Sequence, residues 1–172
     1  MKSVAFAVLG LVALAGPAAG QAPPGPVWTL TLPKAPAETA RLAYGEPGAA
    51  APPLYLSCRP KSGQILAAFD VKQKLAAHRR GDVWIDAIGR PAPWPISVTI
   101  SSSVQKTTLR GVAFPSAATE TVSSVAVEVS TLAPVIADWR KTQVLRIEAV
   151  LETNLQPPAP KAMVSRFLRA CG

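Results

Sequence analysis

The sequence contains few of the residues on which most catalytic and metal sites depend. It has one histidine, His78, and two cysteines among 172 residues. Two cysteines and one histidine cannot complete a structural zinc site without added carboxylates, so we expect no metal and no cofactor. A hydrolytic triad also requires a base. His78 lies beside Arg79 and Arg80, which is typical of a histidine at a basic protein surface.

The familiar catalytic motifs are absent as well. The sequence has no Gly-x-Ser-x-Gly element, no P-loop, no His-Glu-x-x-His and no Cys-x-x-Cys. Residues 103–106 match Ser-x-x-Lys, but the companion elements of penicillin-recognising enzymes are missing, and the match is attributed to chance. We therefore expect no catalytic residue and a protein that is not an enzyme. The alternative is a small hydrolase that uses His78 or the pair Asp82 and Asp86, because two carboxylates on one strand face can act as acid and base.

Long apolar runs are confined to the N-terminus. Lys2 precedes an apolar run at residues 4–14, and small residues and a proline follow as far as Gly20. This order is typical of a secretory signal peptide, which we expect to cover residues 1–20. The run is too short to cross a bilayer as a helix, which requires about 20 residues. We expect a periplasmic or secreted protein whose mature chain has no transmembrane helix.

Short alternating segments dominate the rest of the chain. Residues 21–26 form a proline-rich lead-in, and residues 27–172 are enough for a single β-rich domain with its own core. Residues 96–101 alternate between apolar and polar side chains, and similar segments recur about every 10–12 residues with turns between them. We expect a mainly β fold, an antiparallel sandwich or a barrel-like sheet. Residues 71–80 lack a clear pattern and are expected to form a short helix or an irregular loop.

Two segments have helical periodicity. Residues 132–141 follow Thr131, a residue suited to an N-cap. Residues 161–170 place apolar side chains on one side and Arg166 and Arg169 on the other. The domain should therefore include one or two short helices, one of them C-terminal.

A predicted hairpin at residues 54–71 carries one of the two cysteines. Cys58 lies on the apolar face of its first strand, which suits a buried disulfide. Two cysteines in an exported chain most economically pair with each other. We expect a Cys58–Cys171 disulfide, which would close a loop of roughly 100 residues and fasten the end of the chain to the hairpin.

Positive charge is the other prominent feature. The formal net charge is +8, which favours polyanionic partners, although the charge can also serve only to keep the protein soluble. Export argues against nucleic acid as the partner. The densest group surrounds the predicted hairpin and consists of Arg59, Lys61, Lys72, Lys74, Arg79 and Arg80. A sheet that brings these residues together would form a basic binding patch. Otherwise they are charges that protect a sheet edge from aggregation.

Trp94 is the tryptophan that we expect to be most exposed, because it lies between Pro93 and Pro95 in a proline-rich connection. Such an exposed indole is a candidate contact for a partner. The other three tryptophans lie in patterned segments and are expected in the core.

The order Leu-x-Leu-x-Cys at residues 54–58, a β-rich middle and Phe-Leu-Arg-Ala-Cys at residues 167–171 resembles a broad group of small exported bacterial proteins. Among named groups it is similar to the VasI-like group associated with type VI secretion. That group similarly pairs a cysteine in an early strand with one in a C-terminal helix. The resemblance implies export, a disulfide and a β-rich fold. It carries no active site over to this chain.

Together these features predict an exported, non-enzymatic accessory or binding protein of the bacterial cell envelope. Its partner would be another envelope protein or an anionic envelope component. The main alternative is a binder of anionic lipid or glycan that uses the basic patch, and the small hydrolase is the second alternative.

Overall fold

A computed structural model describes residues 25–49, 52–116 and 122–172. The expected signal peptide, residues 1–20, and most of the lead-in at residues 21–26 lie outside the described residues. Within them the fold is mainly β, with two helices, one of which is C-terminal. The fold class expected from the sequence is therefore confirmed.

The described residues contain eleven strands and two helices. The strands are β1 (Val27–Thr31), β2 (Ala40–Gly45), β3 (Leu54–Cys58), β4 (Gln64–Val71), β5 (Ala76–Arg80), β6 (Val83–Asp86), β7 (Trp94–Ser101), β8 (Lys106–Pro115), β9 (Ser123–Ser130), β10 (Arg146–Ala149) and β11 (Glu152–Leu155). The helices are α1 (Pro134–Thr142) and α2 (Lys161–Cys171).

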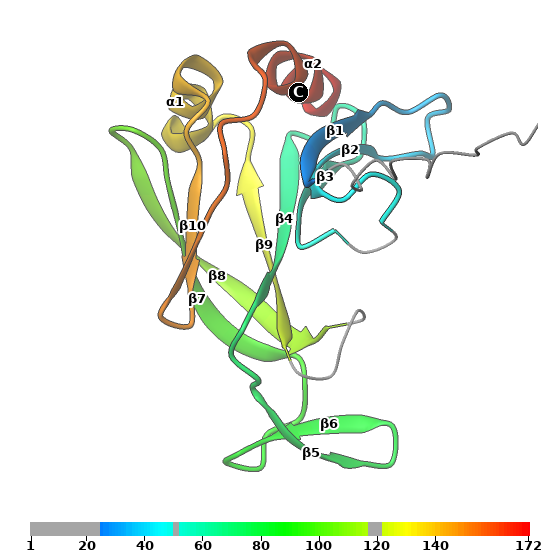
Figure 1. Ribbon diagram of the computed structural model, residues 1–172, viewed down its shortest axis with the longest axis vertical. Coiled ribbons are helices and arrows are strands. Elements are labelled where there is room, and N and C mark those ends of the chain that lie inside the picture. The colour runs from blue at the N-terminus through cyan, green and yellow to red at the C-terminus, as the bar shows by residue number, and fades with distance from the viewer. Residues whose placement is uncertain (1–24, 50–51, 117–121) are drawn as a thin grey trace, which may run out of the picture.

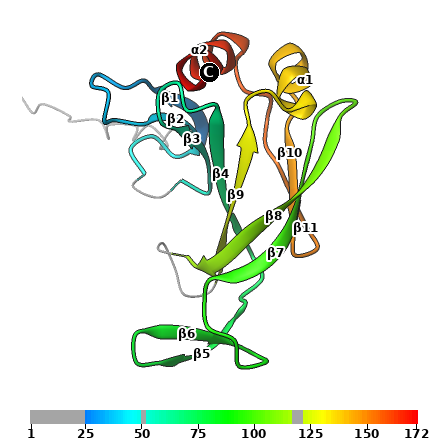
Figure 2. The same ribbon diagram turned by 180° about the vertical axis from the view of Figure 1, so that it is seen from behind.

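Nine of the strands form one sheet in the order β1-β2-β3-β4-β9-β8-β7-β10-β11. Neighbouring strands are antiparallel throughout, and the sheet curls into a half-barrel. The helices α1 and α2 lie together at one end of the curled sheet (Figures 1 and 2). The remaining strands, β5 and β6, form a separate hairpin that projects at the opposite end (Figure 1).

The alternation of the sequence builds the core. In β9 the side chains of Val125, Val127 and Val129 are buried on one face, while Glu128 on the other face is exposed. The strands β4 and β7 alternate in the same way. The largest fully buried side chains are Trp94, Trp139, Phe167, Leu42, Leu56, Ile65, Ile100, Ile136, Ile147, Val71, Val98 and Val125.

One glycine is required where three strands approach closely. Gly111 lies in β8, between β7 and β9. A Cβ atom at this position would lie 2.7 Å from the carbonyl oxygen of Ala126 and 2.8 Å from Cγ2 of Val98. The sheet can therefore take this form only if residue 111 has no side chain.

The two helices cover the core with one face each. The buried side chains of α1 are Val135, Ile136 and Trp139. The corresponding residues of α2 are Val164, Phe167 and Cys171. Neither helix is long and apolar enough to cross a membrane.

The N-cap expected for α1 is wrong. The cap residue is Ala133, which makes no side-chain capping bond. Thr131 is used elsewhere: its hydroxyl donates to the carbonyl oxygen of Gly63 at 3.2 Å, and its N–H donates to the same oxygen at 2.9 Å. These bonds fasten the entrance of α1 to the turn between β3 and β4.

The C-terminus of α2 is fastened to the same turn. Cys58 and Cys171 form the expected disulfide, with their Cα atoms 5.6 Å apart. The N–H of Lys61 donates to the carbonyl oxygen of Ala170, and that of Gly63 to Cys171, both at 2.9 Å. The last carbonyls of a helix have no partner within the helix, so the turn between β3 and β4 supplies donors to two of them, beside the C-cap residue Gly172.

The expectation of a helix or irregular loop at residues 71–80 is wrong, because Ala76–Arg80 forms β5. This strand pairs only with β6, and after Ala76 its side chains are exposed on both faces. Because neither face of this part of the strand is buried, its sequence does not need to alternate between apolar and polar residues.

We expect loss of the disulfide to destabilise the fold. Replacing Cys58 and Cys171 by serine removes a link between residues separated by 113 positions. Removal of such a link from a small domain costs about 2–5 kcal/mol. Thermal denaturation of the variant and of the parent protein tests this, and an unchanged melting temperature would contradict it.

We also expect Gly111→Ala to destabilise the protein, by about 1–3 kcal/mol, because the new methyl group overlaps its neighbours. Urea denaturation gives the free energy of unfolding. The matched control is Gly25→Ala, where a new Cβ would meet nothing within 4 Å. Equal effects of the two substitutions would show that the close approach at Gly111 has no energetic cost.

Candidate anion-binding surface

The structure does not bring the six basic residues of the predicted patch together. Arg59 and Lys61 lie in the turn that precedes β4, whereas Lys72 and Lys74 follow its other end. Eight extended residues place the two ends of β4 about 24 Å apart. The six residues considered as a single basic patch are therefore divided into two groups, one beyond each end of β4.

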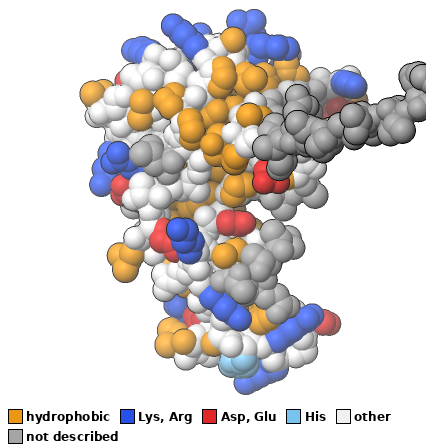
Figure 3. All heavy atoms as spheres, viewed as in Figure 1, with side chains coloured by type: hydrophobic (Ala, Val, Ile, Leu, Met, Phe, Trp, Pro, Cys, Tyr) orange, Lys and Arg blue, Asp and Glu red, His pale blue; other side chains and the backbone are white. Residues whose placement is uncertain are grey.

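The first group belongs to a larger cationic surface at the end that carries the helices. We call it the helical surface, and it consists of Arg59, Lys61, Arg140, Lys141, Lys161, Arg166 and Arg169, all exposed. Lysine and arginine side chains gather over α1 and α2 at this end of the molecule (Figure 3). These cations come from the turn between β3 and β4 and from both helices.

Local helix physics explains why these cations point outward. In α2 the apolar face is buried against the sheet, so Arg166 and Arg169 occupy the opposite, exposed face. Arg140 and Lys141 lie in the last turn of α1, where the partial negative charge of the free carbonyls stabilises cations. The positive charge is thus compatible with helix stability.

The helical surface is not neutralised by ion pairs. Within the described residues both salt bridges lie elsewhere, in or next to the β5–β6 hairpin: Arg79 with Asp82 at 3.3 Å, and Arg90 with Asp86 at 2.8 Å. The only acidic residue in either helix is Asp138. The positive charge of this end is therefore available to a partner.

Asp138 has a structural task. It accepts a hydrogen bond from the hydroxyl of Ser102, and burial partly opposes the resulting fall in its pKa. The N–H groups of Val104, at 3.3 Å, and Ser103 also donate to it, and Lys141 adds a favourable charge. The net result is a pKa below the usual value of 3.8. The ionised carboxylate thereby fastens the tip of the β7–β8 hairpin to α1.

The second basic group lies at the β5–β6 hairpin and includes Lys72, Lys74, Arg79 and Arg80, with the exposed His78 beside them. Arg79 is already engaged, because it bonds Asp82 and lies over the ring of Trp84 at 5.9 Å from the ring centroid.

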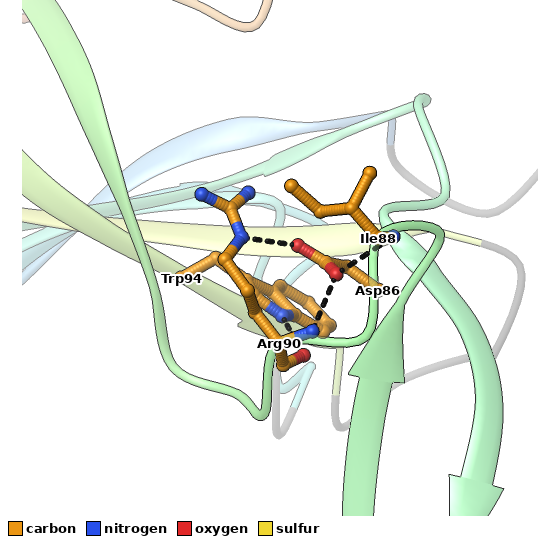
Figure 4. Close-up of polar contacts among 4 residues, drawn as sticks. All are labelled: Asp86, Ile88, Arg90 and Trp94. Atoms are coloured by element: carbon orange, nitrogen blue, oxygen red, sulfur yellow. Dashed lines mark hydrogen bonds and ion pairs between the residues drawn. The ribbon is translucent and has the colours of Figure 1, made fainter.

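The two carboxylates considered for hydrolysis have different environments. Asp82 lies in the turn between β5 and β6 and is fully exposed, whereas Asp86 ends β6 and is buried. One carboxylate oxygen of Asp86 accepts from the N–H groups of Ile88 and Arg90, at 3.0 and 2.8 Å (Figure 4). The other oxygen accepts from Nε of Arg90 at 2.8 Å. Asp86 therefore organises the turn at residues 86–90.

The ionisation of Asp86 follows from these contacts. Burial raises its pKa, but the hydrogen bonds from Arg90 and Ile88 and the charge of Arg90 together outweigh burial. The pKa consequently lies below the usual value of 3.8, and Asp86 is an ionised structural carboxylate at neutral pH.

The expectation that Trp94 is exposed is wrong. Its side chain is 2% exposed, and its indole Nε1 donates to the carbonyl oxygen of Arg90 at 3.0 Å (Figure 4). Trp94 is the first residue of β7, and alternation turns it toward the core while Pro95 faces outward. Pro95 is tolerated because β10 pairs only with residues 98–101 of β7. Trp94 is thus an anchor for the hairpin and not a partner contact.

Sequence reasoning also missed a hollow of about 210 Å³ that is lined by two carboxylates, Asp70 and Glu152. Both have structural partners: Glu152 accepts from the N–H groups of Lys72 and Gln73 at 2.9 and 2.7 Å, and Asp70 accepts from the hydroxyl of Ser124. In the described part of the chain, no group of three or more His, Cys, Asp and Glu side chains is placed to hold a metal ion.

We expect Asp86→Ala to loosen the turn at residues 86–90 selectively. Ile88 and Arg90 lose their acceptor, so their amides should exchange with solvent faster, while those of β4 and β9 stay protected. In the parent protein this stabilisation is complete above the ordinary pKa and is lost as the pH falls through the lowered pKa of Asp86. Hydrogen exchange measures both effects. Asp82→Ala is the control, and an equal effect there would contradict the assigned role.

A comparison of the chain with protein-family models, curated proteins and solved structures finds no match.

Proposed function

We propose that the protein is an exported, non-enzymatic binding protein of the bacterial cell envelope, and that it binds a polyanionic envelope component through the helical surface. One observation carries this proposal. Seven exposed cations lie at one end of the molecule, and no described acidic side chain forms a salt bridge with any of them.

Uncompensated charge of this density favours an anionic ligand. A cation in a surface salt bridge has part of its field cancelled, whereas cations that form no salt bridge add their fields and attract phosphates or carboxylates from a distance. Of the seven, only Lys141 has a described carboxylate, that of Asp138, acting on it electrostatically. Arginine is also suited to paired hydrogen bonds with these groups, and three of the seven cations belong to Arg140, Arg166 and Arg169 on the helices.

The proposed compartment is the periplasm or the exterior of the cell. The disulfide supports an oxidising, extracytoplasmic environment, since such bonds are rare in a reducing cytosol. The signal peptide expected at residues 1–20 supports the same route.

The positions of the acidic groups favour binding over hydrolysis. Asp86 is occupied by the turn at residues 86–90, and Asp82 and His78 are exposed on a projecting hairpin. General acid–base catalysis requires groups that converge on one substrate position. The helical surface, in contrast, offers several exposed cations at one end of the molecule.

The proposal predicts that Arg166→Gln with Arg169→Gln weakens binding to inorganic polyphosphate. An arginine held against an anionic surface contributes about 1 kcal/mol, so the loss of two should raise the Kd roughly 30-fold at low salt. Titration calorimetry measures the affinity. Added salt should weaken the binding of the parent protein by screening.

Lys72→Gln with Lys74→Gln is the matched control, because it removes the same charge from the opposite end of β4. It should leave most of the affinity intact. An equal loss in both variants would mean that only the net charge matters and would contradict a site at the helical surface. Absence of binding by the parent protein at low salt, both to polyphosphate and to anionic lipid vesicles, would overturn the proposed function itself.

A further inference from the structure

We propose that the ligand of the helical surface is an anionic lipid bilayer, and that Val104 and Leu132 enter the bilayer interface while the surrounding cations contact lipid phosphates. This inference rests on the proposed function and names the class of its ligand. It depends on apolar side chains that the binding of a soluble polyanion does not require.

Val104 and Leu132 are large aliphatic side chains turned to solvent. Val104 is 79% exposed and Leu132 is 89% exposed. Isolated apolar residues are ordinary at protein surfaces, so exposure alone carries no argument. Their location does: Val104 is in the tip of the β7–β8 hairpin beside α1, and Leu132 is in the turn that enters α1 (Figure 1). Both therefore border the cationic end.

Hydrogen bonds hold the backbone around Val104 in place. Its N–H donates to Asp138 of α1 at 3.3 Å, and the hydroxyl of Ser102 bonds the same carboxylate. The N–H of Ser102 also donates to the carbonyl oxygen of Gln105 at 2.8 Å and closes the tip. The apolar side chain is thus presented outward by a tip that is already ordered.

The turn of Leu132 is equally constrained. Its N–H donates to the hydroxyl of Ser130 at 3.2 Å, and the N–H of Ala133 donates to the carbonyl oxygen of Ser130 at 3.0 Å. The preceding residue, Thr131, is bonded to Gly63. The backbone of neither turn has to be ordered on binding, which reduces the entropic cost of association.

A bilayer is the ligand that satisfies both parts of this surface. Anionic headgroups attract the cations, each of which is expected to strengthen binding about fivefold, and the acyl boundary accepts aliphatic side chains. Burial of a valine or leucine side chain is expected to add roughly tenfold or more. A second copy of the chain is a poor occupant, because two surfaces with seven cations each repel one another.

The experiment compares vesicles of phosphatidylcholine and phosphatidylglycerol with inorganic polyphosphate. Val104→Ser with Leu132→Ser should reduce affinity for the anionic vesicles roughly a hundredfold and leave affinity for polyphosphate unchanged. The matched control is Ile88→Ser with Leu151→Ser. These side chains are 74% and 106% exposed but lie away from the helices, and the control should bind vesicles like the parent protein.

Insertion has a direct readout. Both native cysteines are in the disulfide, so Val104→Cys adds the only free thiol, which can carry an environment-sensitive fluorophore. Its emission should shift to the blue with anionic vesicles and stay unchanged with polyphosphate. The same label at Leu151→Cys should show no shift.

The outcomes separate this inference from the proposed function. Polyphosphate binding without vesicle binding, or vesicle binding that is indifferent to Val104 and Leu132, overturns the bilayer inference and leaves the proposed function standing. Failure of the parent protein to bind either probe overturns both.

Discussion

The link between the last turn of α2 and residues 59–63 is the constraint on which the rest of the structure depends. A disulfide and two backbone hydrogen bonds join the end of the chain to the turn between β3 and β4, and Thr131 joins the entrance of α1 to the same turn. One short turn thereby fixes both helices over the open end of a curled sheet. The helices close the core and, as a direct result, collect their exposed cations on one surface.

Much of this fold follows from local sequence patterns. Strands with one buried face, such as β7 and β9, alternate clearly, and α2 has an apolar face at helical spacing. The strand β5 was missed because it has no buried face after Ala76, so no pattern marks it. Trp94 was misjudged because its flanking prolines indicated a loop, whereas β7 begins at Trp94 and turns the indole inward.

The candidate surface was only partly predictable. Arg59 and Lys61 are exposed basic residues near the C-terminal helix, and Arg166 and Arg169 were expected opposite its apolar face. Proximity in sequence is a poor guide to the patch, because β4 is extended and separates Arg59 and Lys61 from the other four basic residues considered for it. The actual neighbours of the turn lie about a hundred residues later, and only the tertiary link through Cys171 brings them there.

The β5–β6 hairpin makes the two ends of the molecule different, because the helices lie at one end and the hairpin at the other. It lies at the end remote from α1 and α2, and contacts of Arg90 with Asp86 and with Trp94 join its base to β7 (Figures 1 and 4). A protein seated by its helices on a flat surface would hold this hairpin upright and farthest from that surface. The sheet would then act as a spacer. The helical surface would set the orientation of the protein, and the length of the sheet would set the distance between the β5–β6 hairpin and the flat surface.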